Sequence, residues 1–368
     1  MIDYDGINFN QWDMATEPQT APDSPGLIIE TIDGVEPLDD QFGVDPKKTV
    51  PDALYDSLFG QPTPTAAEFQ AVSGGRLLHT YAILDAAKVP NLPELLASSD
   101  LEHSCLFKGQ AQDDLGHAAP WLVRMLEDRR LTRNLFTHDE KTNDAMGYQW
   151  AREPGVFVRT TADFEAVWKH FRRFTKVQAE NGKWHFFRFY DPAVASPFFE
   201  HNRLDTSLCD TFFKSNDITI QSLISVRGLT GKADIFKPTA SETSIKRPPH
   251  LTLTDQQLIP FRMTQADKDI TSMAQNLRQD FPNELHTQSD TQLHQAIKTS
   301  INRMTAYGFR QKENLYILAA WDLFLGKNFE SREETGTLKS ILENDTPETV
   351  KMQKLKSLLG QSHLERSS

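Results

Sequence analysis

Two carboxylates stand where catalytic side chains often project in α/β proteins, at the ends of predicted strands. Asp85 ends an apolar segment, and Asp191 ends an aromatic segment that also contains Arg188. An enzyme could assemble its site from these scattered residues if the fold brought them into one cleft. They also fit a structural role, in which Asp191 caps a helix that begins at Pro192 and Asp85 pairs with a cation or a backbone donor. Since neither has an evident histidine or cysteine partner, no nucleophile and base can be named.

The spacings that mark specific catalytic and cofactor sites are absent. The chain has no glycine-rich phosphate loop, no G-x-G-x-x-G, no H-E-x-x-H and no G-x-S-x-G. Its 11 histidines are scattered rather than clustered with carboxylates. We therefore expect no metal site, no cofactor and no enzymatic activity.

The sequence predicts short strands that alternate with helices, and these elements would position Asp85 and Asp191. Strands are predicted at 80–84, 103–107, 121–126, 156–159, 184–190 and 218–226. Helices are predicted near 92–98, 112–118, 162–177, 192–201 and 204–214. This alternation predicts an α/β N-terminal lobe in which a mixed sheet is flanked by helices.

The segment 184–190 is the most aromatic of the predicted strands. Alternate residues of a strand face opposite ways, and here both sets contain aromatic side chains. A strand that is apolar on both faces is covered on both. We therefore expect it at the centre of the sheet.

The helix predicted at 162–177 carries a basic face opposite an apolar stripe. Residues 152–188 contain 8 basic and 4 acidic side chains. Such a face fits a solvated helix end, where cations are favoured anyway, or a docking surface for an acidic partner. The candidate partner-binding residues are Lys169, Arg172, Arg173 and Lys176.

Negative charge is concentrated at the N-terminus. Residues 1–60 hold 13 acidic and 2 basic side chains, whereas the other 308 residues hold 38 and 37. The composition predicts an acidic, partly disordered arm, interrupted by a short strand or hairpin at 27–32. One hypothesis is that the arm covers the basic face until a partner displaces it. The neutral body argues against nucleic-acid binding.

The C-terminal part of the chain is predicted to be all-helical. Apolar residues recur at helical spacing in 270–281, 293–304 and 313–325. The predicted divisions are the arm at 1–60, the α/β lobe at 61–235, a linker at 236–252, the helical lobe at 253–345, and a peripheral C-terminal helix and tail at 346–368.

The compartment is predicted to be the cytoplasm. The two cysteines, Cys105 and Cys209, are too few for a disulfide framework. The N-terminus lacks the features of a secretory signal. The longest apolar run, 315–321, is far shorter than the ~20 residues that span a bilayer, so we expect no stable membrane association.

Four blocks in series carry a resemblance to a known family. They are Tyr81-Ala-Ile-Leu-Asp-Ala-Ala87, Leu106-Phe-Lys-Gly109, Ala119-Pro-Trp-Leu-Val123 and Phe187-Arg-Phe-Tyr-Asp-Pro192. In this order and at these distances, the chain resembles the bacterial type VI secretion effector adaptors, also called Tap or Tec chaperones. The resemblance covers residues 79–226, with a looser likeness up to residue 330.

This resemblance implies a non-enzymatic cytoplasmic adaptor. Such proteins bind a toxic effector, usually through its N-terminal region, and help load it onto the VgrG spike. The residues Tyr81, Asp85, Trp121, Arg188, Asp191 and Pro192 would then be structural. The effector would bind where the two lobes meet, since concave sites favour such junctions. The acidic arm departs from the family pattern, and a generic protein-binding module regulated by this arm remains an alternative, as does the scattered-residue enzyme.

Overall fold

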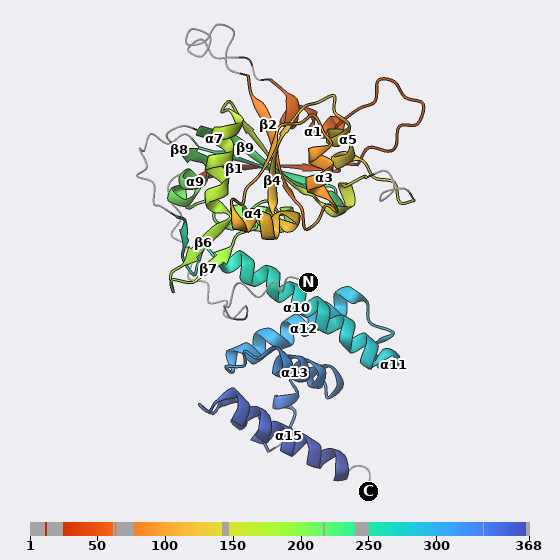
Figure 1. The fold of residues 1–368 in the computed structure, drawn as a ribbon. Helices are drawn as coiled ribbons and strands as arrows, with labels where there is room; N and C mark the ends of the chain where they lie inside the picture. The colour runs from red at the N-terminus through yellow and green to blue at the C-terminus, as the bar shows by residue number, and fades with distance from the viewer. Residues whose placement is uncertain are drawn as a thin grey trace. The chain divides into compact units, whose positions relative to one another are not determined.

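The computed structural model of the 368-residue chain describes residue 12 and residues 25–61, 63, 77–141, 147–215, 218–239, 250–333 and 335–365. These residues belong to two compact units (Figure 1). Residues 25–260 lie in an α/β unit, and Trp12 lies with residues 261–365 in a helical unit. The predicted fold class, an α/β lobe followed by an all-α lobe, is confirmed.

An eight-stranded sheet forms the centre of the α/β unit. Its order is β1 (Leu27–Asp33), β10 (Lys232–Pro238), β9 (Ile218–Arg227), β5 (Gly155–Thr160), β2 (His79–Asp85), β4 (Pro120–Met125) and β3 (His103–Cys105), with β8 (Lys214–Ser215) beside β9. All ladders of this sheet are antiparallel. The strand predicted at 27–32 is β1, but it pairs with the distant β10 rather than in a local hairpin.

Helices cover both faces of this sheet (Figure 1). Those on one face are α1 (Asp52–Phe59), α3 (Leu92–Ala97) and α5 (Arg130–Phe136), and their buried residues share one core with the sheet. Those on the other are α7 (Phe164–Phe171), α8 (Pro192–His201) and α9 (Thr206–Phe213). A short helix, α4 (Gln110–Leu115), precedes β4.

The second face is packed with a phenylalanine cluster. In this cluster the Phe174 and Phe212 ring centroids are 4.7 Å apart, and those of Phe187 and Phe198 are 4.8 Å apart. Aromatic rings bury a large apolar area each, so the cluster is a major source of stability. Its members, all almost fully buried, are Phe171, Phe174, Phe187, Phe189, Phe198, Phe199, Phe212 and Phe213.

The prediction of a central strand at 184–190 is wrong. Only β7 (Trp184–Phe186) is a strand, and it lies at the edge of a separate sheet with β6 (Lys176–Ala179) and β11 (Thr252–Leu253), in the order β11-β6-β7. After Phe186 the chain leaves the strand, and Phe187 and Phe189 insert into the phenylalanine cluster. The aromatic residues of this segment therefore belong to two places, the small sheet and the phenylalanine cluster, and not to two faces of one strand.

The helix predicted at 162–177 is shorter than expected. The helix α7 ends at Phe171, a 3₁₀ turn η3 (Arg172–Phe174) follows, and Lys176 already belongs to β6. The predicted linker at 236–252 overlaps β10, whose residues up to Pro238 pair with β1.

Part of the predicted arm belongs to the α/β unit. The strand β1 and the helix α1 contribute to the sheet and its core, and the buried Arg159 holds the end of α1 by donating to the carbonyls of Leu58 and Gly60. Before residue 25, the arm lies outside the described residues except for Trp12. That side chain is buried in the core of the helical unit.

The helical unit follows the predicted stripes. It contains α10 (Ile259–Asp280), α11 (Pro282–Leu285), α12 (Asp290–Ala306), α13 (Lys312–Phe324), α14 (Thr337–Glu343) and α15 (Glu348–Glu365). Its core includes Met273, Ile297 and Leu318. The last helix, α15, also buries Met352 and Leu355 in this core. No helix in the described ranges combines the length and apolarity that a membrane span requires.

Candidate functional site

Asp85, Arg188 and Asp191, the scattered residues named as a possible site, do converge in the structure. The Arg188 guanidinium pairs with the carboxylate of Asp85 and lies 3.5 Å from that of Asp191. The Lys88 ammonium lies 2.6 Å from the other oxygen of Asp191. Asp85 ends β2 and is 0% exposed, whereas Asp191 stands before α8. Two partly buried cations and two buried carboxylates thus form one ion network.

The two carboxylates have the structural partners that the sequence predicted. The Asp191 side chain accepts the N–H of Ala193 at 3.1 Å and caps α8, with Pro192 in its first turn. The Asp85 carboxylate accepts the N–H of Ala87 at 3.0 Å in addition to its pairing with Arg188. The predicted helix cap and the predicted cation and backbone partners are confirmed.

Burial raises the pKa of the Asp85 carboxyl to about 7. The nearby Asp191 carboxylate also raises this pKa, whereas the N–H of Ala87 and the charge of Lys88 lower it. A group that titrates near neutral pH is suited to proton transfer if a substrate can reach it. Asp85 is 0% exposed, so its carboxyl does not face solvent in this structure.

The network extends to Glu153, which precedes β5. The Lys88 ammonium donates to the Glu153 carbonyl at 3.3 Å, and the Glu153 carboxylate lies 3.5 Å from Arg227 at the end of β9. Glu153 has a φ of 47°, in the left-handed region. The charges thereby tie the ends of β2 and β9 to the start of β5 and of α8.

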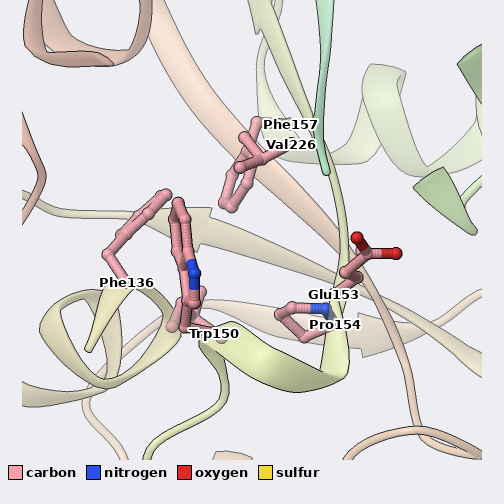
Figure 2. Close-up of a pocket in the computed structure, with 8 residues that line it drawn as sticks. Phe136, Trp150, Glu153, Pro154, Phe157 and Val226 are labelled. Atoms are coloured by element: carbon pink, nitrogen blue, oxygen red, sulfur yellow. The ribbon is translucent and has the colours of Figure 1, made fainter. Parts of the chain in front are cut away.

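A small hollow lies beside this network, and Figure 2 shows the residues around it. The Glu153 carboxylate points away from the rings of Phe136 and Trp150. Asp85, Arg188 and Asp191 do not line the hollow, so the network touches it only through Glu153. Its lining residues are Leu135, Phe136, Trp150, Glu153, Pro154, Gly155, Phe157 and Val226. In the part of the chain that the structure describes, no group of three His, Cys, Asp or Glu residues is placed to hold a metal ion.

Tyr81 and Trp121 also have structural surroundings. The Tyr81 hydroxyl donates to the Ala162 carbonyl at 2.8 Å, and burial raises its pKa to about 12. The Trp121 indole N–H donates to the Gly116 carbonyl at 2.9 Å. Both side chains lie on paired strands, β2 and β4; Tyr81 holds the loop after β5, and Trp121 holds the 3₁₀ turn η1 (Gly116–Ala118) before β4.

The four candidate basic residues do not share one helix face. Lys169 on α7 pairs with Glu165 at 3.1 Å. The other three lie over aromatic rings: Arg172 over Trp168 at 4.5 Å, Arg173 over Phe174 at 5.3 Å and Lys176 over Phe186 at 5.0 Å. Cation–π contacts of this kind hold the charged groups beside apolar surface.

Lys176 belongs to an exposed aromatic face on the small sheet. Trp184 is 52% exposed and Phe186 is 49% exposed. The Phe107 ring centroid lies 5.9 Å from that of Phe186, and the His250 ring centroid lies 4.9 Å from that of Trp184. We define the aromatic face as Phe107, Lys176, Gln178, Trp184, Phe186 and His250. The other side of β6 and β7 is buried through Val177, Ala179 and His185.

Sequence reasoning missed this face although a signal was present. Asn181-Gly182 lies between β6 and β7, and Gly182 has a φ of 80°. An Asn-Gly pair between alternating residues is the strongest short-range signal of a hairpin. It would have paired the strand predicted to begin at Trp184 with a strand before the turn, where the helix was predicted to extend to residue 177.

Comparison with known proteins gives one family match. Residues 80–206 match the model of a domain of unknown function, DUF4123. No curated protein and no solved structure matches the chain. The matched segment runs from β2 into the start of α9 and contains Asp85, Arg188 and Asp191 as well as β6 and β7. It leaves out β1, β9, β10 and the helical unit.

Proposed function

We propose that this chain is a non-enzymatic cytoplasmic adaptor that binds a type VI secretion effector and helps to load it onto the VgrG spike. All four sequence blocks that resemble such adaptors fall inside the segment that matches the domain of unknown function. The observation that carries the proposal is the exposed aromatic face. Half-exposed tryptophan and phenylalanine side chains on one small sheet are typical of a surface that another protein covers.

The ionisable groups support binding rather than chemistry. Asp85, Arg188 and Asp191 pair with one another in the interior, where they hold the sheet to α8. The cations beside the aromatic face stand on the surface instead, with Lys176 exposed over Phe186. A partner can therefore reach the second set of charges without opening the fold.

Co-expression tests the proposal directly. The full chain, carrying an affinity tag, is produced with the effector encoded beside it and then with that effector and VgrG. We expect the chain to retain the effector, and its deletion in the parent bacterium to abolish effector release while leaving effector synthesis intact. Effector release that is equal with and without the chain would contradict the adaptor function.

A matched pair of variants connects the function to the aromatic face. Trp184→Ser removes an exposed aromatic side chain from this face, and Leu229→Ser removes one of the most exposed apolar side chains, 75% exposed, from the 3₁₀ turn after β9. We expect the first variant to lose effector capture and the second to keep it. Equal capture by both variants would place the effector on another surface.

The convergence of Asp85, Arg188 and Asp191 is the observation that favours the alternative, an enzyme with a site assembled from scattered residues. The variant Asp85→Asn separates the two functions. An adaptor with this substitution still captures and delivers its effector when it is folded. A folded variant that captures the effector but no longer supports its release would favour chemistry at Asp85.

A further inference from the structure

We propose that the outer edge of β7 is a docking site for an extended segment of a partner polypeptide, which adds to the small sheet as a fourth strand. The segment places apolar side chains against Trp184 and Phe186 and an acidic side chain against Lys176. The identity of the partner as an effector rests on the proposed function. The docking site itself is argued from the geometry of the edge alone.

The hydrogen bonds of the hairpin determine which residues of β7 face β6. At one end the Ala179 N–H donates to the Lys183 carbonyl at 2.9 Å, and at the other the Phe187 N–H donates to the Thr175 carbonyl at 3.0 Å. In an antiparallel ladder, successive residues direct their backbone groups to opposite edges. The odd-numbered residues of this strand therefore pair with β6.

The backbone groups of Trp184 and Phe186 consequently point to the outer edge. The partner strand shows the same alternation, because Gln178, which lies opposite Trp184, directs its N–H away from β7 and donates it to Leu251 at 2.9 Å. No strand among the described residues pairs with the outer edge of β7. Two residues thus offer two donors and two acceptors to an added strand.

The side chains at this edge are those that a protein normally protects. Natural sheets shield exposed edges with prolines, lysines, inward-pointing charges, very short strands or a covering element. The strand Trp184-His185-Phe186 is short, but it contains no proline, lysine or acidic residue, and its aromatic side chains are half exposed. A partner that pairs with this edge covers both the backbone groups and the rings.

The charge around the edge determines the chemistry of the partner. Residues 168–186 contain five Lys and Arg residues and one acidic residue, Glu180. Lys176 is exposed on the aromatic face, and it forms no ion pair with another described residue. An acidic side chain on the same face of the added strand would meet this cation, and salt would weaken the contact.

A synthetic peptide tests the edge without the effector. The probe is a short capped peptide with two phenylalanines at alternate positions, flanked by glutamates. Its first control carries lysines in place of the glutamates. Its second control is N-methylated at the backbone positions that would pair with β7. We expect the full chain to bind the probe and neither control, as measured by fluorescence anisotropy.

Two substitutions at one position separate the ring from the backbone. Trp184→Ala removes the ring, and we expect binding to weaken about tenfold or more, as for aromatic hot-spot residues. Trp184→Pro also removes the outward N–H but no ladder hydrogen bond, so the hairpin tolerates it and binding weakens further. Thermal unfolding of both variants checks that they fold like the wild type.

The outcomes distinguish the edge from the adaptor function. If the probe binds in a way that depends on Trp184 but the chain captures no effector, the docking site is supported and the effector is rejected as its partner. Effector capture by Trp184→Pro, together with equal binding of the N-methylated probe, would overturn the docking site and leave the adaptor function standing.

The acidic N-terminus of the chain is the competing occupant. Changing Asp3, Asp5, Asp13, Glu17 and Asp23 to the corresponding amides removes its charge and keeps Trp12. We expect the neutralised chain to bind the probe with unchanged affinity at low salt. A large gain in affinity would identify this segment as the occupant and overturn the assignment to a separate partner.

Discussion

The two sheets of the α/β unit use neighbouring aromatic residues in opposite ways. Phe187 and Phe189 are almost fully buried in the phenylalanine cluster, whereas Trp184 and Phe186, a few residues earlier, are half exposed on the small sheet. The difference lies in the elements that pack against each pair. The helices α7, α8 and α9 cover the first pair, and no strand among the described residues pairs with the outer edge beside the second. Aromatic content alone therefore does not separate framework from binding surface.

The charged residues divide in the same way. Arg188 and Lys88 are committed to buried carboxylates, while Lys176 lies over an exposed ring. Buried charges that lose a partner are costly, and surface charges are not. Substitutions in the main sheet should therefore act on stability, and substitutions on the small sheet should act on binding.

The largest expected effect contrasts the two aromatic sets. Phe189→Ala should lower the free energy of unfolding by about 3–5 kcal/mol, because it leaves a cavity in the phenylalanine cluster. Phe186→Ala should lower it by less than about 1 kcal/mol, since half of that ring is already in water. Denaturant titration of both variants measures the difference. Similar losses would show that the small sheet is as much a part of the core as the main sheet.

The next effect concerns the buried ion network. Above pH 7, where the Asp85 carboxyl is ionised, Arg188→Met should destabilise the protein by about 3 kcal/mol, because it leaves that carboxylate buried without its guanidinium partner. Adding Asp85→Leu should recover part of this loss, since no unpaired carboxylate then remains at that position. Chemical denaturation of the single and double variants gives the coupling. A double variant that loses the sum of both single effects would contradict a specific pairing.

A pH dependence is expected from Asp85. Its pKa is raised to about 7 in the folded chain, so the folded state holds a proton that the unfolded state releases near the ordinary pKa of 3.8. The contribution of the Asp85 carboxyl to the free energy of unfolding is therefore greatest at low pH, and it is lost as the pH rises from 3.8 to about 7. The stability of Asp85→Asn relative to the wild type should increase from pH 4 to pH 7. A constant difference across this range, measured by thermal or denaturant unfolding, would exclude the raised pKa.

The smallest effect separates two of the basic residues. Lys169→Ala removes an exposed pair with Glu165 and should change the free energy of unfolding by less than about 0.5 kcal/mol. It should also leave probe binding unchanged, whereas Lys176→Ala should weaken it, because only Lys176 lies on the aromatic face. Equal effects on binding would restore the four basic residues to one docking surface.

Local patterns predicted the elements better than their neighbours in space. The helical unit could be predicted because its apolar stripes, such as that from Ile270 to Leu277, repeat at a local spacing. The cap at Asp191 could be predicted from its neighbour Pro192. In contrast, the alternation of side chains in 184–190 does not tell whether a strand lies at the centre or at the edge of a sheet. The end of α7 was also missed, because residues 176–179 form a strand of the hairpin and not the end of a helix.

The convergence of Asp85, Arg188 and Asp191 was only partly predictable. Asp85 and Asp191 were recognised because each ends a regular segment, but their shared contact with Arg188 spans 103 residues of sequence between Arg188 and Asp85. The role of β10 was hidden for the same reason, because its partner β1 lies near the other end of the unit. Long-range pairing is a tertiary property that local propensity does not encode.

The pairing of β1 with β10 has a consequence for synthesis on the ribosome. The cross-strand pair Glu30 and Lys237 is separated by 207 residues, so β1 leaves the exit tunnel long before its partner exists. At about 5–20 residues per second, that interval is on the order of ten seconds or more, during which an isoleucine-rich strand has no native neighbour. A nascent chain of this protein therefore passes through a prolonged stage in which holdase chaperones can act on its first strand.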